Sequence, residues 1–310
     1  MNISIIVCTY NRVDSLNRTL QSIKAMTVSD DIEWELLIVD NNSTDNTRKV
    51  VDEFISTSGL NCRYILEENQ GHSHARNRGI NESCGEIIAY TDDDVIVDKY
   101  WLQNIDNVFK ENSISCVGGK ILPIWEISCP EWLDNNHDFY GNLALLDYGD
   151  SPFYLDKPKI WGANFVVKKI MFEKYGTFNT SLGRIFGKLC SFDETDFLQR
   201  LIENGEKILY TPNLIVHHCI PAKRMRKSYF RKWRFDNSEM SALLKGPCHD
   251  RNIIGVPLYM IRQTFIIFFQ WIFTLPLSWS RHFRKELELF DKVGFISGCL
   301  KVKWSRKYKL

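Results

Sequence analysis

The chain has 310 residues, of which 44% are hydrophobic and 25% are charged, so it can form one large domain or two smaller ones. Nine scattered cysteines, odd in number and without a CxxC pair, argue against a zinc module or a full disulfide framework. The net charge of +1 hides an asymmetry, because residues 220–310 carry 19 Lys and Arg against 6 Asp and Glu. The acidic front part suits a metal and its substrate, and the basic tail suits phosphates or an anionic membrane.

Strand-like and helix-like patterns alternate over the first 120 residues. Continuous apolar runs predict buried strands at 3–9, 34–40, 62–68 and 86–91. Helix-like segments lie between them at 14–26, with Asp14 as the expected N-cap, at about 45–58 and at about 73–83. The alternation predicts an α/β fold with a mostly parallel, Rossmann-like sheet, helices on both faces, and ligands beyond the carboxyl ends of the strands.

Polar side chains follow three of these strands where each strand ends. They are Thr9, Tyr10, Asn11 and Arg12 after the first strand, Asp40, Asn41 and Asn42 after the second, and Asp92, Asp93 and Asp94 after the fourth. Because the carboxyl ends of parallel strands share one edge, we expect these groups to converge there. Asx turns alone would explain some of them, but not the whole set.

Three consecutive aspartates repel one another. Two unit charges about 4 Å apart repel by roughly 1 kcal/mol in water and by roughly 4 kcal/mol at an effective dielectric near 20. A divalent cation such as Mg²⁺, Ca²⁺ or Mn²⁺ would offset this repulsion, because carboxylate oxygens are its preferred ligands. The alternative is a solvated acidic turn.

The rhythm of strands and helices breaks after residue 120. The stretch 121–160 is rich in Trp, Pro and Asn, which is typical of a substrate-facing loop, and 161–169 is again strand-like. The pattern of 191–205 predicts a helix that begins near Asp193 and Glu194 and ends at Gly205. The two acids are either stabilised by the helix dipole or take part in the chemistry.

Seven segments, in this order, resemble the family 2 glycosyltransferases: SIIVCTYNR, LLIVDNNSTDNT, NQGHSHARNRGI, AYTDDDV, WGANFVVKK, FDETDFLQRL and VHH. Members of that family are inverting enzymes with the A-type nucleotide-sugar fold. The resemblance covers roughly residues 1–220, which implies a catalytic domain there and leaves 221–310 as a basic, aromatic, helical extension.

The resemblance also implies roles for individual residues. The implied nucleotide-sugar site consists of Thr9, Tyr10, Asn11, Arg12, Asp40, Asn42, Arg76, Asp92, Asp93, Trp161, Gly162, Ala163 and Asn164. Asp40 would bind the base or ribose, Arg76 the phosphates, and the segment from Trp161 would form the floor of the sugar and acceptor site. The implied metal is Mn²⁺ or Mg²⁺, held by Asp94 and by one of His217 and His218.

The family's catalytic base belongs to an acidic pair usually written Glu-Asp, whereas here the order is Asp193, Glu194. The position in the family's motif that the base usually occupies is held here by Glu194, and Asp193 is the alternative. The implied reaction moves a sugar, from a UDP donor in the first instance, to a saccharide or polyprenol-linked glycan in polysaccharide biosynthesis. The alternatives are a sugar nucleotidyltransferase, and a non-catalytic nucleotide- or glycan-binding protein on the same fold.

The tail carries two informative stretches. Residues 221–235 interleave seven basic residues with aromatic ones, which suits a diphosphate clamp with Arg224, an anionic membrane anchor, or RNA. No RNA-binding module accompanies the stretch, so we expect no nucleic-acid partner.

Residues 263–280 form an uncharged run of 18 residues with basic flanks. They predict an interfacial helix in preference to a buried helix or a membrane span. The chain opens without a basic leader. Together these features predict a cytoplasmic protein, peripheral at the inner face of the membrane.

Overall fold

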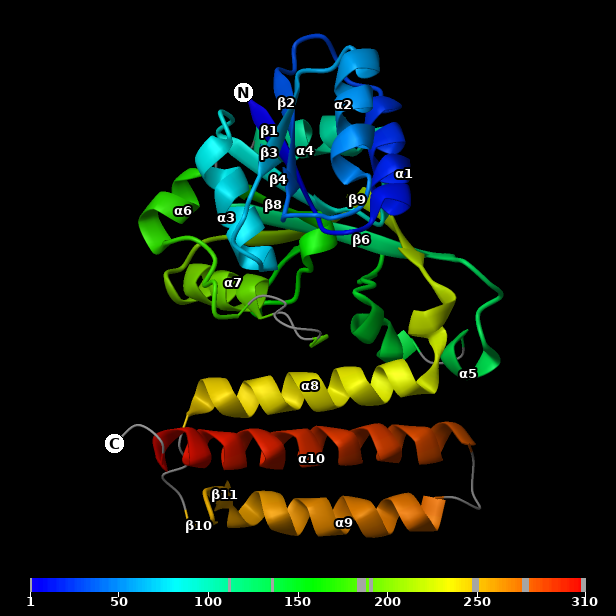
Figure 1. The fold of residues 1–310 in the computed structure, drawn as a ribbon, viewed down its shortest axis with the longest axis vertical. Helices are drawn as coiled ribbons and strands as arrows, with labels where there is room; N and C mark the ends of the chain where they lie inside the picture. The colour runs from blue at the N-terminus through cyan, green and yellow to red at the C-terminus, as the bar shows by residue number, and fades with distance from the viewer. Residues whose placement is uncertain are drawn as a thin grey trace. The chain divides into compact units, whose positions relative to one another are not determined.

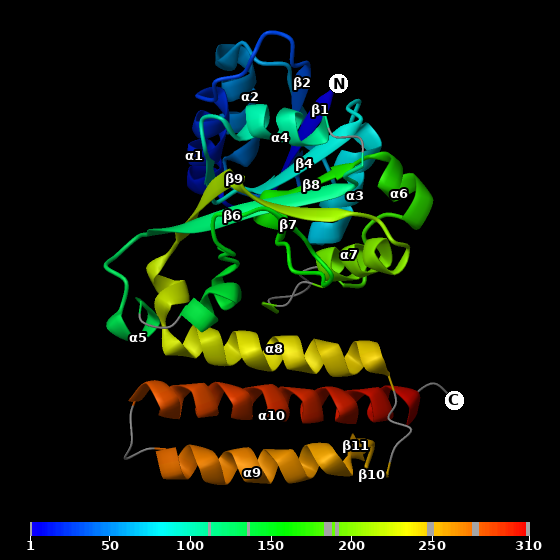
Figure 2. The same ribbon diagram turned by 180° about the vertical axis from the view of Figure 1, so that it is seen from behind.

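A computed structural model describes residues 2–110, 113–134, 137–182, 188–189, 192–246, 251–274 and 279–307. The chain divides into two compact units, which Figures 1 and 2 show from opposite sides. The first, called the sheet unit, comprises Met1–Glu126, Leu143–Ile185 and Phe192–Ile220. The second, called the helical unit, comprises Ile127–Asn142, Phe186–Ser191 and Pro221–Leu310.

One large sheet organises the sheet unit. Its strands are β1 (Ile3–Thr9), β2 (Trp34–Asp40), β3 (Cys62–Leu66), β4 (Ile87–Asp92), β5 (Val95–Val97), β6 (Cys116–Trp125), β7 (Phe153–Tyr154), β8 (Phe165–Lys168) and β9 (Ile208–Ile220). They form a nine-stranded sheet in the order β3, β2, β1, β4, β8, β6, β9, β5, with β7 paired to β9. The first four strands are mutually parallel, as the apolar runs predicted, whereas β8 runs antiparallel to both β4 and β6.

Helices cover both faces of this sheet (Figure 1). They are α1 (Val13–Lys24), α2 (Thr47–Ser58), α3 (His72–Glu82), α4 (Trp101–Phe109), α6 (Ile170–Tyr175) and α7 (Asp193–Glu203). Alternate strand residues such as Ile6, Leu37 and Ile88 pack with residues of α3, α6 and α7 in one core cluster. The two helices α1 and α2 lie on the opposite face (Figure 1), so the sheet is buried on both sides.

Some boundaries differ from the sequence predictions. The helix α1 begins at Val13, and its first N–H donates to Asp45 Oδ2 at 3.2 Å, so Asp14 lies inside the first turn and is not the cap. The predicted strand at 161–169 begins as a short 3-10 helix, η2 (Gly162–Asn164), before β8. The stretch expected to be a loop from residue 121 starts with the second half of β6, which continues to Trp125.

The long pairing of β6 with β9 depends on Gly119. The register shifts between Gly119 and Lys120, where the strands approach so closely that a Cβ on Gly119 would lie 2.0 Å from the carbonyl oxygen of Leu214. A bulge of this kind needs glycine because a side chain would push the strands apart. Sequence periodicity does not predict such a contact, and the sequence pattern did not predict this strand.

The helical unit is built from three long helices, α8 (Lys227–Lys245), α9 (Leu258–Thr274) and α10 (Trp279–Lys307). In both views α10 lies between α8 and α9 (Figures 1 and 2). The shorter elements are α5 (Glu131–Asp134), η1 (His137–Leu143), η3 (Ala222–Met225) and the hairpin β10 (Asn252–Ile253) with β11 (Val256–Pro257). The predicted helical C-terminal extension is confirmed.

The uncharged run at 263–280 falls mostly on α9. Its residues 275–278 lie outside the described residues. Among the helices that the structure describes, none is long and apolar enough to cross a bilayer.

A buried carboxylate ties α8 to α10. Glu239 is 2% exposed and receives the ammonium groups of Lys188 at 2.7 Å and Lys301 at 2.5 Å, with the hydroxyl of Ser297 at 2.6 Å. Burial alone would raise the pKa of Glu239, but these partners outweigh burial and lower its pKa from 4.5 to about 2.

We expect Glu239→Gln to destabilise the protein at pH 7 by about 1–2 kcal/mol, a figure reduced because solvent screens the exposed Lys301. The lowered folded-state pKa means that this stabilisation is present above pH 4.5 and is lost as the pH falls toward 2. Urea unfolding of wild type and variant at pH 7 and pH 3 measures the difference. The control is Glu288→Gln, whose exposed pair with Lys285 contributes roughly 0.5 kcal/mol or less. A Glu239 effect that does not change with pH would contradict this assignment.

Candidate active site

The carboxyl ends of β1, β2 and β4 lie side by side, as the sequence predicted. In the parallel register Thr9 pairs with Asp40, and Cys8 pairs with Asp92. The polar residues that follow each strand are thereby brought to one edge of the sheet. This edge is the crevice in which α/β sheets bind ligands.

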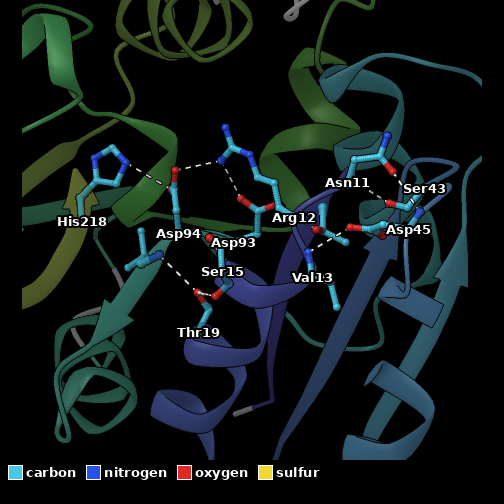
Figure 3. A network of polar contacts seen from close by, with 12 residues as sticks. Asn11, Arg12, Val13, Ser15, Thr19, Ser43, Asp45, Asp93, Asp94 and His218 are labelled. Atoms are coloured by element: carbon cyan, nitrogen blue, oxygen red, sulfur yellow. Dashed lines mark hydrogen bonds and ion pairs between the residues drawn. The ribbon is translucent and has the colours of Figure 1, made fainter. Parts of the chain in front are cut away.

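Arg12 lies against two of the three consecutive aspartates (Figure 3). Its Nη1 is 3.0 Å from Asp93 Oδ1 and 2.8 Å from Asp94 Oδ2. Asp93 also accepts a hydrogen bond from Thr9 Oγ1 at 2.8 Å, and its carbonyl oxygen accepts one from Ser15 Oγ at 2.7 Å. The guanidinium of Arg12 therefore offsets the repulsion between these aspartates.

The pKa values reflect this enclosure. Burial would lower the pKa of Arg12, but the carboxylates of Asp93 and Asp94 hold it well above its usual value. Burial raises the pKa of Asp93 to about 6, with Arg12 opposing the rise and Asp94 adding to it. An arginine stays charged in such a setting, so the cluster keeps a fixed positive group facing the crevice.

One of the two predicted histidines contacts the aspartates. His218 Nε2 lies 3.2 Å from Asp94 Oδ1, and both residues are buried (Figure 3). Successive strand residues point to opposite faces, so His217 points away from the side on which His218 meets Asp94. Of the predicted metal set, the structure joins Asp94 and His218 and leaves His217 apart.

The donor groups at Asp94 and His218 suit a divalent metal, since carboxylate oxygen and imidazole nitrogen are ligands that Mn²⁺ accepts. In the described ranges no three His, Cys, Asp or Glu side chains are gathered to hold a metal ion. Mg²⁺ commonly binds through one or two carboxylates together with substrate phosphates, not in an all-protein cage. The residues therefore fit a metal that completes its coordination with the diphosphate of a ligand.

Asp92 acts electrostatically on two arginines. Its carboxylate raises the pKa of Arg12 and that of Arg76, so it is close enough to act on both. Asp92 is partly exposed, unlike the buried Asp93 and Asp94. The first aspartate of the three is consequently the most exposed to a ligand.

The loop after β2 is fastened on both sides. Asp40 accepts hydrogen bonds from the N–H of Ser43 at 2.9 Å and from the hydroxyl of Tyr64 at 2.8 Å. Burial and Asp40 together raise the pKa of Tyr64 to about 12. Asn42 is exposed in the left-handed region with φ +64°, at the tip of this loop.

Asn11 clamps the same loop from β1. Its Oδ1 accepts the N–H groups of Thr44 at 2.7 Å and Asp45 at 3.3 Å, while its own N–H donates to Ser43 Oγ (Figure 3). Tyr10 beside it is exposed. Asn11 therefore shapes the predicted nucleotide pocket, and Tyr10 presents its ring on the surface.

Arg76 on α3 holds the acidic pair at the start of α7. Its Nη1 lies 3.1 Å from Asp193 Oδ2 and its Nη2 lies 2.8 Å from Glu194 Oε1. Its guanidinium also lies 5.6 Å from the ring centroid of Tyr90 and 5.3 Å from that of Phe178. Arg76 is buried and both ends of its guanidinium contact carboxylates, and its predicted approach to the phosphates stays a prediction.

The two acids differ in access. Asp193 is 0% exposed and also accepts a hydrogen bond from Ser73 Oγ at 3.0 Å, whereas the side chain of Glu194 is 12% exposed. A carboxylate that takes a proton from a substrate must reach it. The geometry therefore favours Glu194 as the base, as its place in the motif did. Asp193 would then orient Arg76.

Gly162 lets η2 lie directly on this acidic pair. A Cβ at Gly162 would fall 1.8 Å from Arg76 Nη2 and 2.4 Å from Glu194 Oε1. The carbonyl of the next residue, Ala163, accepts a hydrogen bond from Thr91 Oγ1 at 3.1 Å, one residue before Asp92. The segment from Trp161, which is half-buried, thus joins the acidic pair to the edge of the sheet.

Asn164 supports this segment from within. It is 0% exposed, accepts a hydrogen bond from Trp101 Nε1 at 2.9 Å, and donates to the carbonyl groups of Lys120 and Leu214 at 3.0 Å. The amide of Asn164 is satisfied by the protein, and its predicted place in the nucleotide-sugar site stays a prediction. Arg224 is buried in η3 of the helical unit, and its predicted phosphate contact stays a prediction.

Sequence reasoning missed several contacts that build the site. Ser73 bonds Asp193, Ser15 bonds the backbone of Asp93, and Asn41 binds the backbone of Glu67, Asn69 and Gly71. A hydroxyl one turn before Arg76 on a predicted helix was an available signal for Ser73. The contacts of Ser15 and Asn41 join distant segments, and no local sequence pattern predicts them.

Comparison with known proteins identifies a matching family and several relatives. The family model described as glycosyl transferase family 2 matches residues 4–176. Glucosyl-dolichyl phosphate glucuronosyltransferase of Haloferax volcanii is 28% identical over 224 residues, which cover 70% of this chain and 69% of that protein. Succinoglycan biosynthesis protein ExoM of Rhizobium meliloti is 25% identical over 311 residues, 99% of this chain and 96% of that protein.

The solved structures agree in fold. Mannosyltransferase PcManGT from Pyrobaculum calidifontis, in complex with GDP-Man and Mn²⁺, superposes with a TM-score of 0.59 at 18% identity, covering 99% of this chain and 75% of that one. The predicted A-type glycosyltransferase fold is thereby confirmed. With a family model that matches more than half of its length, the chain belongs to glycosyl transferase family 2.

Proposed function

We propose that the protein transfers a sugar, with inversion, from a nucleotide-sugar donor to a hydroxyl of a saccharide or lipid-linked glycan. The observation that carries this proposal is the placement of Glu194. Its carboxylate is partly accessible, is held by the buried Arg76, and is joined through η2 to the strand edge that carries the three aspartates. A base and a phosphate-binding edge within one unit are what a single displacement at an anomeric carbon requires.

In this proposal Glu194 accepts the proton of the attacking hydroxyl. The ion pair with Arg76 fixes the direction of the carboxylate, while Asp193, which accepts a hydrogen bond from Ser73, holds the other end of the guanidinium. A positioned base of this kind commonly contributes a factor of roughly 100 to 10,000 in rate. Attack from the side opposite the leaving group inverts the anomeric centre.

The donor would lie along the edge that Arg12, Asp92 and Asp94 form. Asp92 has the surface to meet the ribose, and Arg12 supplies a fixed positive charge near the leaving phosphates. Asp94 and His218 are the residues that would hold Mn²⁺ or Mg²⁺. When bound, such an ion neutralises charge that develops on the diphosphate. The Mn²⁺ and nucleotide sugar in the PcManGT complex support this arrangement.

The acceptor is proposed to be a saccharide or a polyprenol-linked glycan in polysaccharide biosynthesis. The names of the two relatives, one acting on a dolichyl phosphate sugar and one in succinoglycan biosynthesis, support this class. Residues 1–220 would form the catalytic domain. The basic region 221–310 would contact an anionic membrane at its cytoplasmic face, with no nucleic-acid partner.

Isothermal titration with UDP and with GDP, each with Mn²⁺ and with a chelator, tests the donor site. We expect metal-dependent binding, with UDP the favoured nucleotide, and a loss of at least about tenfold in Asp94→Asn, because one charged ligand of the metal is removed. The matched control is Asp52→Asn, an exposed aspartate of the same unit paired only with Arg48 four residues away among the described contacts.

Either of two results would contradict the proposal. One is that folded protein binds neither nucleotide with or without metal, which would favour a solvated acidic turn. The other is that Asp94→Asn binds as tightly as Asp52→Asn. Release of nucleoside diphosphate, and not of pyrophosphate, in the presence of acceptor would separate transfer of a sugar from transfer of a nucleotidyl group.

A further inference from the structure

The outer surface of α9 is apolar and exposed. One side of this helix packs on α10, where Met260 joins Val256, Cys299 and Ala242 in a small core. The opposite side presents Phe265, Phe269 and Phe273, spaced four residues apart, with 61%, 55% and 70% of their areas exposed. Residues at this spacing lie on one face of a helix.

Further apolar side chains widen this surface, which we call the α9 face. It comprises Leu258, Tyr259, Phe265, Ile266, Phe268, Phe269, Ile272 and Phe273. Burial of apolar side chains is favourable, so the protein is stabilised by covering the whole set. A helix that is apolar on nearly every side is normally enclosed by protein or by lipid. Contiguous exposed surfaces of this kind mark sites of interaction.

The positive charge around the α9 face favours one kind of partner. From Arg251 to Lys285 the sequence contains five Lys and Arg and no Asp or Glu. Arg262 is exposed on α9 itself. A second copy of this chain would bring the same positive charges against each other, whereas anionic lipid headgroups attract them.

The length and packing of α9 decide how it meets the membrane. Its 17 residues correspond to about 25 Å at about 1.5 Å per residue, less than the roughly 30 Å of a hydrocarbon core. On its far side α10 is joined to α8 by the ion pairs Arg231 with Glu286 and Arg234 with Asp291, which lipid would not accommodate. A helix backed by charged pairs can lie in the interface but cannot be surrounded by lipid.

We propose that the α9 face docks the protein on the surface of a bilayer containing anionic lipid, with α9 parallel to the membrane plane. The phenylalanines enter the boundary between headgroups and acyl chains, and Arg251 and Arg262 contact the phosphates. The docking would place the proposed transfer reaction next to a lipid-linked acceptor, and its role in that reaction rests on the proposed function. It stands apart from that reaction experimentally, because binding to vesicles requires neither donor nor acceptor.

Flotation of the full chain with vesicles of 30% phosphatidylglycerol in phosphatidylcholine, compared with pure phosphatidylcholine, tests the docking. We expect wild type to partition at least about tenfold more strongly onto the anionic vesicles, and Phe265→Ser/Phe269→Ser to lose at least about tenfold of that binding. The matched control is Ile127→Ser/Ile170→Ser, two exposed isoleucines outside α9. Retained nucleotide binding or an unchanged circular dichroism spectrum shows that each variant is folded.

A second variant separates the two contributions. Arg251→Gln/Arg262→Gln leaves the α9 face intact, so we expect it to reduce the preference for anionic vesicles by several fold without abolishing association. The proposal is overturned if wild type does not float, if the serine variant binds like its control, or if wild type is a dimer that the serine variant dissociates while neither binds vesicles. Flotation without nucleotide binding would contradict the proposed transfer reaction and leave the docking standing.

Discussion

Glu194→Gln should lower the rate of sugar transfer by roughly 100- to 10,000-fold while nucleotide binding stays within about twofold of wild type. The amide of Gln still accepts a hydrogen bond from Arg76 but cannot take a proton from the acceptor hydroxyl. Release of nucleoside diphosphate in the presence of acceptor measures the rate, and isothermal titration measures binding. The effect is confined to the chemical step because the substitution keeps size and contacts.

Two further variants of α7 complete this experiment. Glu203→Gln alters an exposed acid at the other end of the same helix and should leave the rate unchanged. Asp193→Asn changes the enclosed partner of Arg76, so its main effect should be on stability. If Glu194→Gln transfers sugar at the wild-type rate while folded Asp193→Asn does not, Asp193 is the base and the assignment by register and exposure is wrong.

Arg76→Met should destabilise the protein by about 3–5 kcal/mol. The substitution takes the guanidinium away from the carboxylates of Asp193 and Glu194, and removing one partner of a buried ion pair is costly. It also removes the contacts of the guanidinium with the rings of Tyr90 and Phe178. Urea unfolding monitored by circular dichroism gives the change in unfolding free energy.

The control for Arg76→Met lies two residues away on the same helix. Arg78 pairs with Glu82 at 2.9 Å, but its side chain is 47% exposed, so Arg78→Met should cost roughly 0.5 kcal/mol or less. The double variant Arg76→Met/Asp193→Asn should be less destabilised than the sum of the single changes, because the charge left behind is also removed. Equal effects of the substitutions at positions 76 and 78 would refute the buried ion pair.

The fold followed from the sequence where burial is continuous. The runs at 3–9 and 34–40 coincide with β1 and β2, because a strand buried on both faces is mostly apolar, and the buried polar residues Ser4 and Glu35 bond each other. The same reasoning placed Thr9, Asp40 and Asp92 at one edge. It failed for β6 and η2, where Gly119 and Gly162 permit close approaches that depend on the partner segment and not on local periodicity.

The sequence predicted which residues form the site, but not which of them contact one another. The motif resemblance identified Arg12, the three aspartates and the acidic pair. It did not predict that Arg12 lies against Asp93 and Asp94, or that Arg76 turns inward. In each case a basic residue can point to a ligand or to a carboxylate of the chain, and the residue types are the same either way.

What the sequence determined by itself is the order of the strands along the chain, the residue types at their ends and the family to which the chain belongs. The tertiary structure alone decided which charges meet. Arg12 and Asp93 are 81 residues apart, and Arg76 and Asp193 are 117 apart, so their pairing depends on the parallel register and on the packing of α7 against α3. Local propensity acts over a few residues, whereas the energy of a buried ion pair depends on geometry that only the folded sheet supplies.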